Sequence, residues 1–285
     1  MFFIKTIRSC MIVSLTVQCL CVFGAPAAIK KIPISYMSGD LRITGLMSKP
    51  EGSGPFPVVI INHGGFDPAS SVGGFMDIFT AFGLVAIASD YRGVAGSAGK
   101  HELAAGEVDD VLNAIVYAKT LPSIDSERIV MWGYSHGGAI AFLAAARSPE
   151  IKAIATFGAP IEFADCYKYW KENVGTTPSL EKLIACSIYV GGTPEENPDA
   201  WKIRSPLYVA GRIACPTLIA QGGKDEAVPA RQAVLMAETM KRSGNTNVIL
   251  LLDPESHHVF DAGTFERIVK PMAAFLLVRA GVGRK

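Results

Sequence analysis

The sequence predicts an α/β domain in which helices cover both faces of a mostly parallel sheet. Short runs such as Val58–Ile61 are apolar on both faces, as expected of strands buried in a parallel sheet. Between these runs lie segments with apolar residues at helical spacing, so strands and helices alternate along the chain. The composition agrees, because 49% of the residues are hydrophobic and 19% are charged, which is sufficient for a sizeable core.

The first two strands are predicted to form a hairpin. The runs Ile32–Met37 and Leu41–Met47 flank Ser38-Gly39-Asp40, a sequence typical of a tight turn. The buried strands are then predicted, in chain order, at Val58–Ile61, Leu84–Ala88, Ile129–Trp132, Ala153–Phe157, Thr217–Ala220 and Val248–Leu252.

Amphipathic helices are predicted between these strands. One covers Val108–Lys119, a second follows Pro229, and a third begins near Phe265 and must start or kink at Pro271. The stretch 161–210 interrupts the alternation and predicts an insertion of short helices. Ligands of such sheets bind at the carboxyl ends of the strands, so this insertion is expected to act as a lid or a substrate wall.

The first 27 residues have the pattern of an export signal. Lys5 and Arg8 precede the mostly apolar stretch Met11–Phe23, and small residues up to Ala27 suit a signal peptidase. Cleavage there would leave residues 28–285, the predicted α/β domain, as a secreted or periplasmic protein. The alternative is an uncleaved N-terminal anchor, for which the apolar stretch is short.

Composition excludes several functions. The formal net charge of +1 provides no basic field for nucleic acid. Past the N-terminal segment, no apolar run reaches the length of a membrane-spanning helix, so we expect no integral span in the mature chain. The five histidines are scattered and no Cys-x-x-Cys or His-Glu-x-x-His motif occurs, which predicts no metal and no other cofactor.

Three cysteines remain beyond the N-terminal segment: Cys166, Cys186 and Cys215. If one bridge forms, Cys166–Cys186 is favoured because both residues lie in the same irregular segment. The alternative is three buried thiols.

The segment Gly133–Gly137 has the pattern Gly-x-Ser-x-Gly between the predicted strand Ile129–Trp132 and a helix of small residues. A tight strand-to-helix turn holds such a serine above the sheet, and the glycines remove side chains that would clash. The helix N-terminus favours developing negative charge. The pattern predicts Ser135 as a nucleophile; the alternative is a serine that only caps the helix.

A serine hydroxyl requires a base that an acid orients. In this type of fold the chain order is serine, acid, histidine, and beyond the motif itself only His257 and His258 follow Ser135. We predict His258 as the base, because the apolar pair Val259-Phe260 after it can anchor the loop. His257 is the alternative.

The acid is expected in the loop after the strand Thr217–Ala220. Asp225 lies there, ahead of Pro229, and would accept the imidazole N–H and stabilise the imidazolium. Glu226 is its nearest competitor, and Asp253 lies too close to the histidine in the chain to approach from a separate loop. A helix N-cap is the alternative role for Asp225.

An oxyanion hole is predicted from Asn62–Phe66, which follows the strand Val58–Ile61. Glycines let this backbone approach the substrate, so the N–H of Gly65 or Phe66 would be one donor. The N–H of His136, the residue after the nucleophile, would be the second. We expect His63 to brace the loop.

Two further polar groups lie in the loop after the strand Leu84–Ala88. Tyr91 or Arg92 could border the pocket, but an ion pair of Arg92 that pins the loop is the favoured interpretation. His101 and Glu102 are expected to be an exposed loop pair without a role.

The chain resembles the catalytic domain of the prolyl oligopeptidase family of α/β-hydrolases over about residues 40–280. The segments that carry the resemblance are PFPVVIINHGG (55–65), DYRG (90–93), IDSERIVMWGYSHGG (124–138), SPLYVAGRIACPTLIAQGGKDEAVP (205–229) and SHHVF (256–260). The resemblance implies an α/β-hydrolase fold, no cofactor, and Ser135, Asp225 and His258 as the triad. The dienelactone hydrolase group is similar in shape but typically carries cysteine as its nucleophile.

Two features depart from the family. Too few residues precede Pro55 for the β-propeller that restricts the family's substrates to short peptides, and Val259 replaces the usual glycine after the catalytic histidine. We therefore expect an exported serine hydrolase that cleaves an ester or peptide bond of a small substrate through an acyl-enzyme. The alternatives are a catalytically inactive binding protein with this fold and a membrane-tethered interaction protein.

Overall fold

The computed structural model describes residues 29–175 and 183–283. The predicted signal segment, residues 1–27, lies outside them. The described chain contains an eight-stranded sheet with the order β1-β2-β4-β3-β5-β6-β7-β8. Its strands are β1 (Ile32–Ser38), β2 (Leu41–Ser48), β3 (Phe56–Asn62), β4 (Val85–Ser89), β5 (Ile124–Tyr134), β6 (Ile151–Phe157), β7 (Thr217–Gly222) and β8 (Val248–Asp253).

The strand pairing confirms the predicted hairpin and parallel sheet. β1 and β2 are antiparallel about a turn in which Gly39 has φ +57°, and β2 is also antiparallel to β4. Across the sheet, in the spatial order β4-β3-β5-β6-β7-β8, every pair of neighbouring strands is parallel. The chain passes from β3 to β4 on one side and later returns to β5 on the other. The carboxyl ends of β3 and β5 therefore flank a topological switch point, where ligands of such sheets bind.

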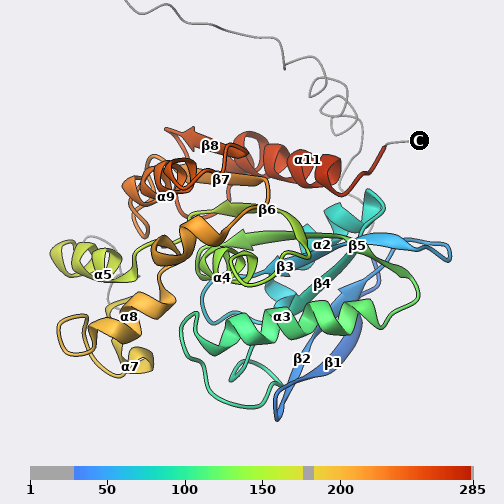
Figure 1. Cartoon of the computed structure of the whole chain (residues 1–285), viewed down its shortest axis with the longest axis horizontal. Coiled ribbons are helices and arrows are strands. Elements are labelled where there is room, and N and C mark those ends of the chain that lie inside the picture. The colour runs from blue at the N-terminus through green and yellow to red at the C-terminus, as the bar shows by residue number, and fades with distance from the viewer. Residues whose placement is uncertain (1–28, 176–182, 284–285) are drawn as a thin grey trace, which may run out of the picture.

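Two helical layers cover the sheet (Figure 1). One face packs on α3 (Gly106–Lys119), α4 (His136–Ala145) and α9 (Arg231–Arg242), and the other on α2 (Gly73–Ala81) and α11 (Lys270–Arg279). Alternate residues of each buried strand face opposite layers, which explains why the strands are apolar throughout.

The last helix begins as the prolines require. The π-helical turn Phe265–Val269 leads directly into α11, and Pro271, which has no N–H to donate, occupies the second position of α11. Pro229 lies two residues before α9 begins, so it precedes that helix and is not part of its first turn.

The insertion is helical, as its composition indicated, and lies beside the sheet at the ends of β6 and β7 (Figure 1). Trp170 and Trp201 are buried anchors: their indole N–H groups donate to Ala227 O at 2.7 Å and to Gly192 O at 3.0 Å. The bond to Ala227 attaches the insertion to the loop after β7. The helices of the insertion are α5 (Phe163–Glu172), α7 (Ser187–Val190), α8 (Pro198–Arg204) and the 3-10 helix Pro206–Arg212.

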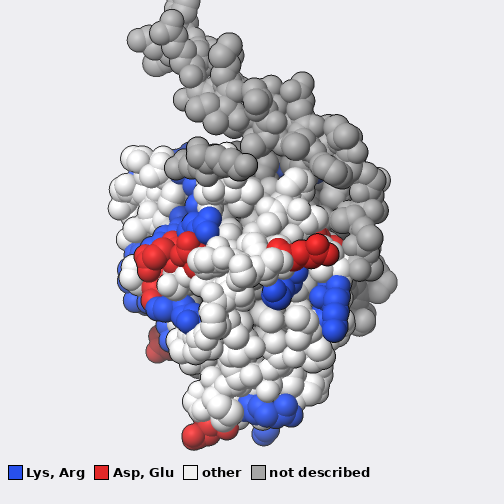
Figure 2. All heavy atoms as spheres, turned by 90° about the vertical axis from the view of Figure 1, so that its right-hand side faces the viewer, with Lys and Arg blue, Asp and Glu red and all other residues white. Residues whose placement is uncertain are grey.

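The surface charge follows the nearly neutral composition. Figure 2 shows basic and acidic side chains interspersed on the face that it presents, where they form no field of a single sign. Within the two described stretches of chain, no helix is both long and apolar enough to cross a membrane.

Candidate active site

Ser135 occupies a strained turn between β5 and α4. Its backbone has φ +52° and ψ −123°, a conformation that is costly for a residue other than glycine. The flanking glycines allow the close packing of this turn. A Cβ on Gly133 would lie 2.6 Å from Gly137 O, and a Cβ on Gly137 would lie 2.2 Å from Asn62 O. The predicted need for glycine at both positions is confirmed by these contacts.

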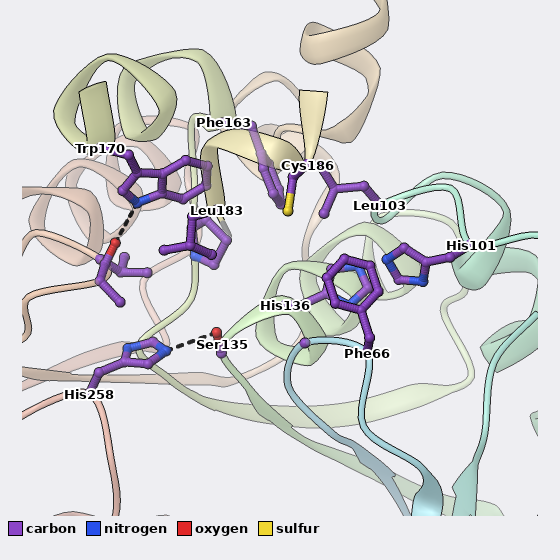
Figure 3. Close-up of a pocket in the computed structure, with 14 residues that line it drawn as sticks. Phe66, His101, Leu103, Ser135, His136, Phe163, Trp170, Leu183, Cys186 and His258 are labelled. Carbon is purple, nitrogen blue, oxygen red and sulfur yellow. Dashed lines mark hydrogen bonds between the residues drawn. The ribbon is translucent and has the colours of Figure 1, made fainter. Parts of the chain in front are cut away.

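The structure brings the three predicted side chains together. His258 Nε2 is 3.0 Å from Ser135 Oγ, and His258 Nδ1 is 2.8 Å from Asp225 Oδ2 (Figure 3). The Asp225 side chain is fully buried, and its Oδ1 accepts the backbone N–H groups of Ala227 and Val228 at 2.9 and 2.7 Å. A carboxylate held in this way accepts the N–H of Nδ1, which leaves Nε2 as the acceptor for the serine hydroxyl.

The competing residues lie elsewhere. His257 is half exposed and its Nδ1 is 3.4 Å from Glu226 Oε2 at the surface. Asp253 accepts hydrogen bonds from the Ser256 hydroxyl and from Arg267 Nε. These contacts place the alternatives His257 and Glu226, and also Asp253, in hydrogen-bond pairs that do not include Ser135.

Two residues that the sequence analysis missed shape the pair formed by His258 and Asp225. The Tyr134 hydroxyl donates to the backbone carbonyl of His258 at 2.8 Å and so ties the histidine loop to the nucleophile turn. Gly158, just after β6, has φ +61°, and a Cβ there would lie 3.1 Å from His258 Nδ1 and 3.2 Å from Asp225 Oδ2. A glycine directly after a buried strand was the available signal for this position.

The predicted oxyanion loop lies against the nucleophile. Gly65 and Phe66 line the same pocket as Ser135 and His136. A Cβ on Gly64 would lie only 3.2 Å from the Cβ of Ser135, so glycine permits this approach. The backbone donors proposed for the oxyanion thus come from segments that meet beside the serine hydroxyl.

His63 braces this loop from behind. Its ring is buried, and Nε2 lies 2.9 Å from the Ser89 carbonyl at the end of β4. Burial lowers the pKa of His63, which keeps the ring neutral, so Nε2–H donates to Ser89 while the ring itself stays out of the pocket lining.

The prediction for His101 is wrong. Its ring is buried and lines the pocket beside His136, whereas the sequence suggested an exposed loop residue. The loop between β4 and α3 folds back over the oxyanion loop, aided by left-handed conformations at Leu103 (φ +54°) and Ala104 (φ +61°). No local sequence pattern indicates this path.

Arg92 forms the predicted ion pair. Its guanidinium contacts Asp110 at 2.9 Å and Glu102 at 2.9 Å, and these charges hold the arginine pKa above its usual value. Glu102 therefore has a structural partner, contrary to expectation. Tyr91 is buried beneath the site, with its ring 4.2 Å from that of His63, and does not border the pocket.

The pocket above Ser135 is small and mostly apolar, with a volume of about 60 Å³. The insertion forms its upper wall with Phe163, Trp170, Leu183 and Cys186, which face the serine in Figure 3. A cavity of this size and composition suits a short apolar group next to the reacting carbonyl.

The cysteines do not form the favoured bridge. Cys166 and Cys186 are buried thiols that no disulfide joins. Burial raises the pKa of the Cys186 thiol to about 11, so it is no competing nucleophile near neutral pH. Within the described residues, no cluster of His, Cys, Asp and Glu could hold a metal ion.

Known proteins resemble this chain in sequence. The sequence model of the prolyl oligopeptidase family matches residues 71–281, a range that contains Ser135, Asp225 and His258. The uncharacterized peptidase YtmA of Bacillus subtilis is 26% identical over 223 residues, which cover 77% of this chain and 83% of that protein.

Solved structures share the fold. The Pyrococcus furiosus esterase Pf2001 aligns with a TM-score of 0.70 at 19% identity, over 90% of this chain and 92% of that one. The acylaminoacyl peptidase of Pyrococcus horikoshii aligns with a TM-score of 0.70 at 20% identity over 90% of this chain. This chain spans only 41% of that peptidase's length.

Proposed function

Because this chain belongs to the prolyl oligopeptidase family and is a serine hydrolase with an α/β-hydrolase fold, we propose that it cleaves an ester or amide bond through an acyl-enzyme on Ser135. One observation carries the proposal: a continuous hydrogen-bonded chain runs from Ser135 Oγ through His258 to the buried carboxylate of Asp225. This arrangement supplies the nucleophile, the base and the group that orients the base.

The first half of the reaction forms the acyl-enzyme. His258 Nε2 takes the proton from Ser135 Oγ as the oxygen attacks the substrate carbonyl. Asp225 stabilises the imidazolium and keeps its ring in place. Backbone N–H groups of His136 and of Gly65 or Phe66 bind the oxyanion, and the imidazolium then gives its proton to the leaving group as the carbonyl–heteroatom bond breaks.

The second half releases the acid. A water molecule replaces the leaving group, His258 takes its proton, and the hydroxide attacks the acyl carbonyl. The oxyanion collapses, the bond to Ser135 Oγ breaks, and the proton returns to the serine. Apart from this water molecule and the substrate, the two halves use only groups of the chain.

The pocket limits one side of the substrate to a small apolar group. Its walls are mostly carbon, and the imidazoles of His101 and His136 stay neutral because burial lowers their pKa, that of His101 to about 4. Near neutral pH the pocket therefore presents no charge to the substrate besides the catalytic groups.

Hydrolysis of a substrate panel tests the proposal. The full chain and Ser135→Ala are compared on p-nitrophenyl esters of short acids and on aminoacyl p-nitroanilides, and the ratio of the two rates separates esterase from peptidase activity. We expect wild-type turnover and covalent labelling by a fluorophosphonate, both lost in Ser135→Ala. Equal labelling of the two proteins would contradict the proposal.

A non-catalytic binding protein is not favoured, because such a protein has no need to keep this hydrogen-bonded chain, the glycines around Ser135 and the oxyanion loop together.

We also propose export of the protein with removal of residues 1–27, on the basis of their charge and hydropathy pattern. N-terminal sequencing of protein from the extracellular or periplasmic fraction should give Ala28 as the first residue. An intact Met1 would contradict cleavage.

A further inference from the structure

A second, larger cavity adjoins the catalytic pocket. This groove has a volume of about 850 Å³ and opens to solvent. Phe66 and His101 line both the groove and the small pocket, so the two spaces meet at these two rings. Besides Phe66, the groove is formed by the loop between β4 and α3 and by Ile188 and Tyr189 of α7.

A substrate of the proposed reaction has an acyl group and a leaving group, one on each side of the reacting bond, and either of them can be the larger part. The small pocket admits only a short group. Any larger part must leave the pocket, and the groove lies directly beyond Phe66, whose backbone belongs to the oxyanion loop. The groove is thus placed to receive the larger part of the substrate while the carbonyl is held at Ser135.

Aromatic rings dominate the junction between the two spaces. The rings of Phe66 and His101 are 4.2 Å apart, those of Phe66 and Tyr189 5.1 Å, and those of His101 and Tyr189 5.2 Å. Phe66 is 43% exposed and Tyr189 is 44% exposed, so each offers part of its ring to a ligand. Large rings exposed together beside a catalytic serine are typical of a binding surface.

The groove offers little to attract a charged group by comparison. Its one carboxylate, Glu102, is paired with Arg92 at 2.9 Å. Lys100 forms no ion pair within the described residues, but its ammonium is exposed and hydrated, so its pull on an anion is weak.

We propose that this groove is a second substrate subsite, which selects an aromatic ring on the larger part of the substrate by contact with Phe66 and Tyr189. Aromatic pairs gain from edge-to-face and offset contacts in addition to the area that they bury, and a saturated ring of the same size does not. The inference rests on the proposed function and adds a substrate class to it: esters or amides with a small apolar group at the serine and an aryl group beyond it.

Matched phenyl and cyclohexyl substrates test this subsite, with the full chain and hydrolysis followed by pH-stat. Ethyl phenylpropanoate against ethyl cyclohexylpropanoate places the ring on the acyl side. Phenylethyl butanoate against cyclohexylethyl butanoate places it on the alcohol side. We expect one of the two pairs to show a phenyl preference of about 5-fold in kcat/KM, the size of one aromatic contact.

Two variants assign the preference to the groove. Tyr189→Leu keeps an apolar side chain but removes one of the two rings, and we expect the phenyl preference to fall to about 2-fold, the part that Phe66 supplies. Tyr208→Leu is the matched control, because Tyr208 is 53% exposed on the same insertion but does not line the groove. It should keep the full preference.

The outcomes separate this inference from the proposed function. Ester hydrolysis that requires Ser135 but shows no phenyl preference in either pair overturns the subsite and leaves the hydrolase standing. A preference that is undiminished in Tyr189→Leu, or that Tyr208→Leu lowers equally, overturns the assignment to the groove. If no ester or amide is hydrolysed, the proposed function fails and the subsite fails with it.

Discussion

The imidazoles on the two sides of Ser135 differ in their partners. His258 has a hydrogen-bond partner on each ring nitrogen, at 3.0 and 2.8 Å. On the other side, His101 and His136 lie with ring centroids 5.2 Å apart, and no ring nitrogen of either makes a hydrogen bond of normal geometry. Nδ1 of His101 lies 3.1 Å from Glu107 Oε1.

Partners, and not proximity to the nucleophile, decide which of these histidines can act as a base. His136 is adjacent to Ser135 in the chain, yet burial without a charged partner lowers its pKa well below the usual value. His258 has a buried carboxylate behind it that stabilises the protonated ring. The imidazole of His258 is thus placed to carry a proton on one side of the serine, whereas those of His101 and His136 form a neutral wall on the other.

Removal of each imidazole in turn should give the largest difference between the two sides. His258→Ala should lower kcat about 10⁴-fold, because the base is lost. His136→Phe should lower it less than about 10-fold, since only the backbone N–H of His136 is assigned to the reaction. Steady-state kinetics on one p-nitrophenyl ester measures both. His257→Ala is the control, and a loss there as large as that of His258→Ala would reverse the assignment of the base.

A substitution at Gly137 should disrupt the turn that holds Ser135 between the two groups of imidazoles. Gly137→Ala should destabilise the fold by about 3 kcal/mol, because its new Cβ would overlap the backbone oxygen of Asn62. Gly74→Ala in α2 is the control: a Cβ there meets no atom within 4 Å, so it should be neutral or slightly stabilising. Urea unfolding measures both. Equal stability of the two variants would mean that the turn relaxes without cost.

The buried, neutral imidazole of His101 should be detectable in the pH dependence of the free energy of unfolding. Burial lowers the pKa of His101 to about 4, so the unfolded chain takes up a proton more readily than the folded one. Wild type should thus lose up to about 3 kcal/mol as pH falls from 6.5 to 4, relative to His101→Phe.

Denaturant unfolding of both proteins across that range measures the difference. Burial also raises the pKa of Glu107, which gives the opposite slope, and Glu107 contacts His101, so the same comparison is repeated with Glu107→Gln in both proteins to separate its contribution. Parallel stability curves would contradict a buried, neutral His101.

The smallest effect is expected at the link between the nucleophile turn and the histidine loop. Tyr134→Phe removes the hydrogen bond to the His258 carbonyl, which helps to position the histidine. We expect the activation free energy to rise by about 1 kcal/mol, which is a 5-fold fall in kcat with KM nearly unchanged. Tyr117→Phe, on α3 away from the site, should leave kcat as it is. A Tyr134→Phe enzyme with full kcat would show that the histidine loop holds its position without this bond.

The sequence was sufficient for features that are local or fixed by chain order. The parallel sheet follows from strands that are apolar on both faces, and the position of Ser135 follows from glycine spacing at one turn. Asp225 and His258 were found because each follows a recognisable strand. His101 was missed because its burial depends on the path of a long loop over another loop. Gly158 and Tyr134 were missed because their role lies in contacts with residues more than sixty positions away.

Gly158 also shows how the fold leaves space for chemistry. Ser135, Asp225 and His258 follow β5, β7 and β8, and β6, which lies between β5 and β7 in the sheet, is followed directly by Gly158, a residue without a side chain. The side chains of Asp225 and His258 meet beside the space that Gly158 leaves without a side chain. A single methyl group there would press on both without altering either, so an evolving lineage could silence this enzyme, or restore it, at a position that no inventory of reactive groups would include.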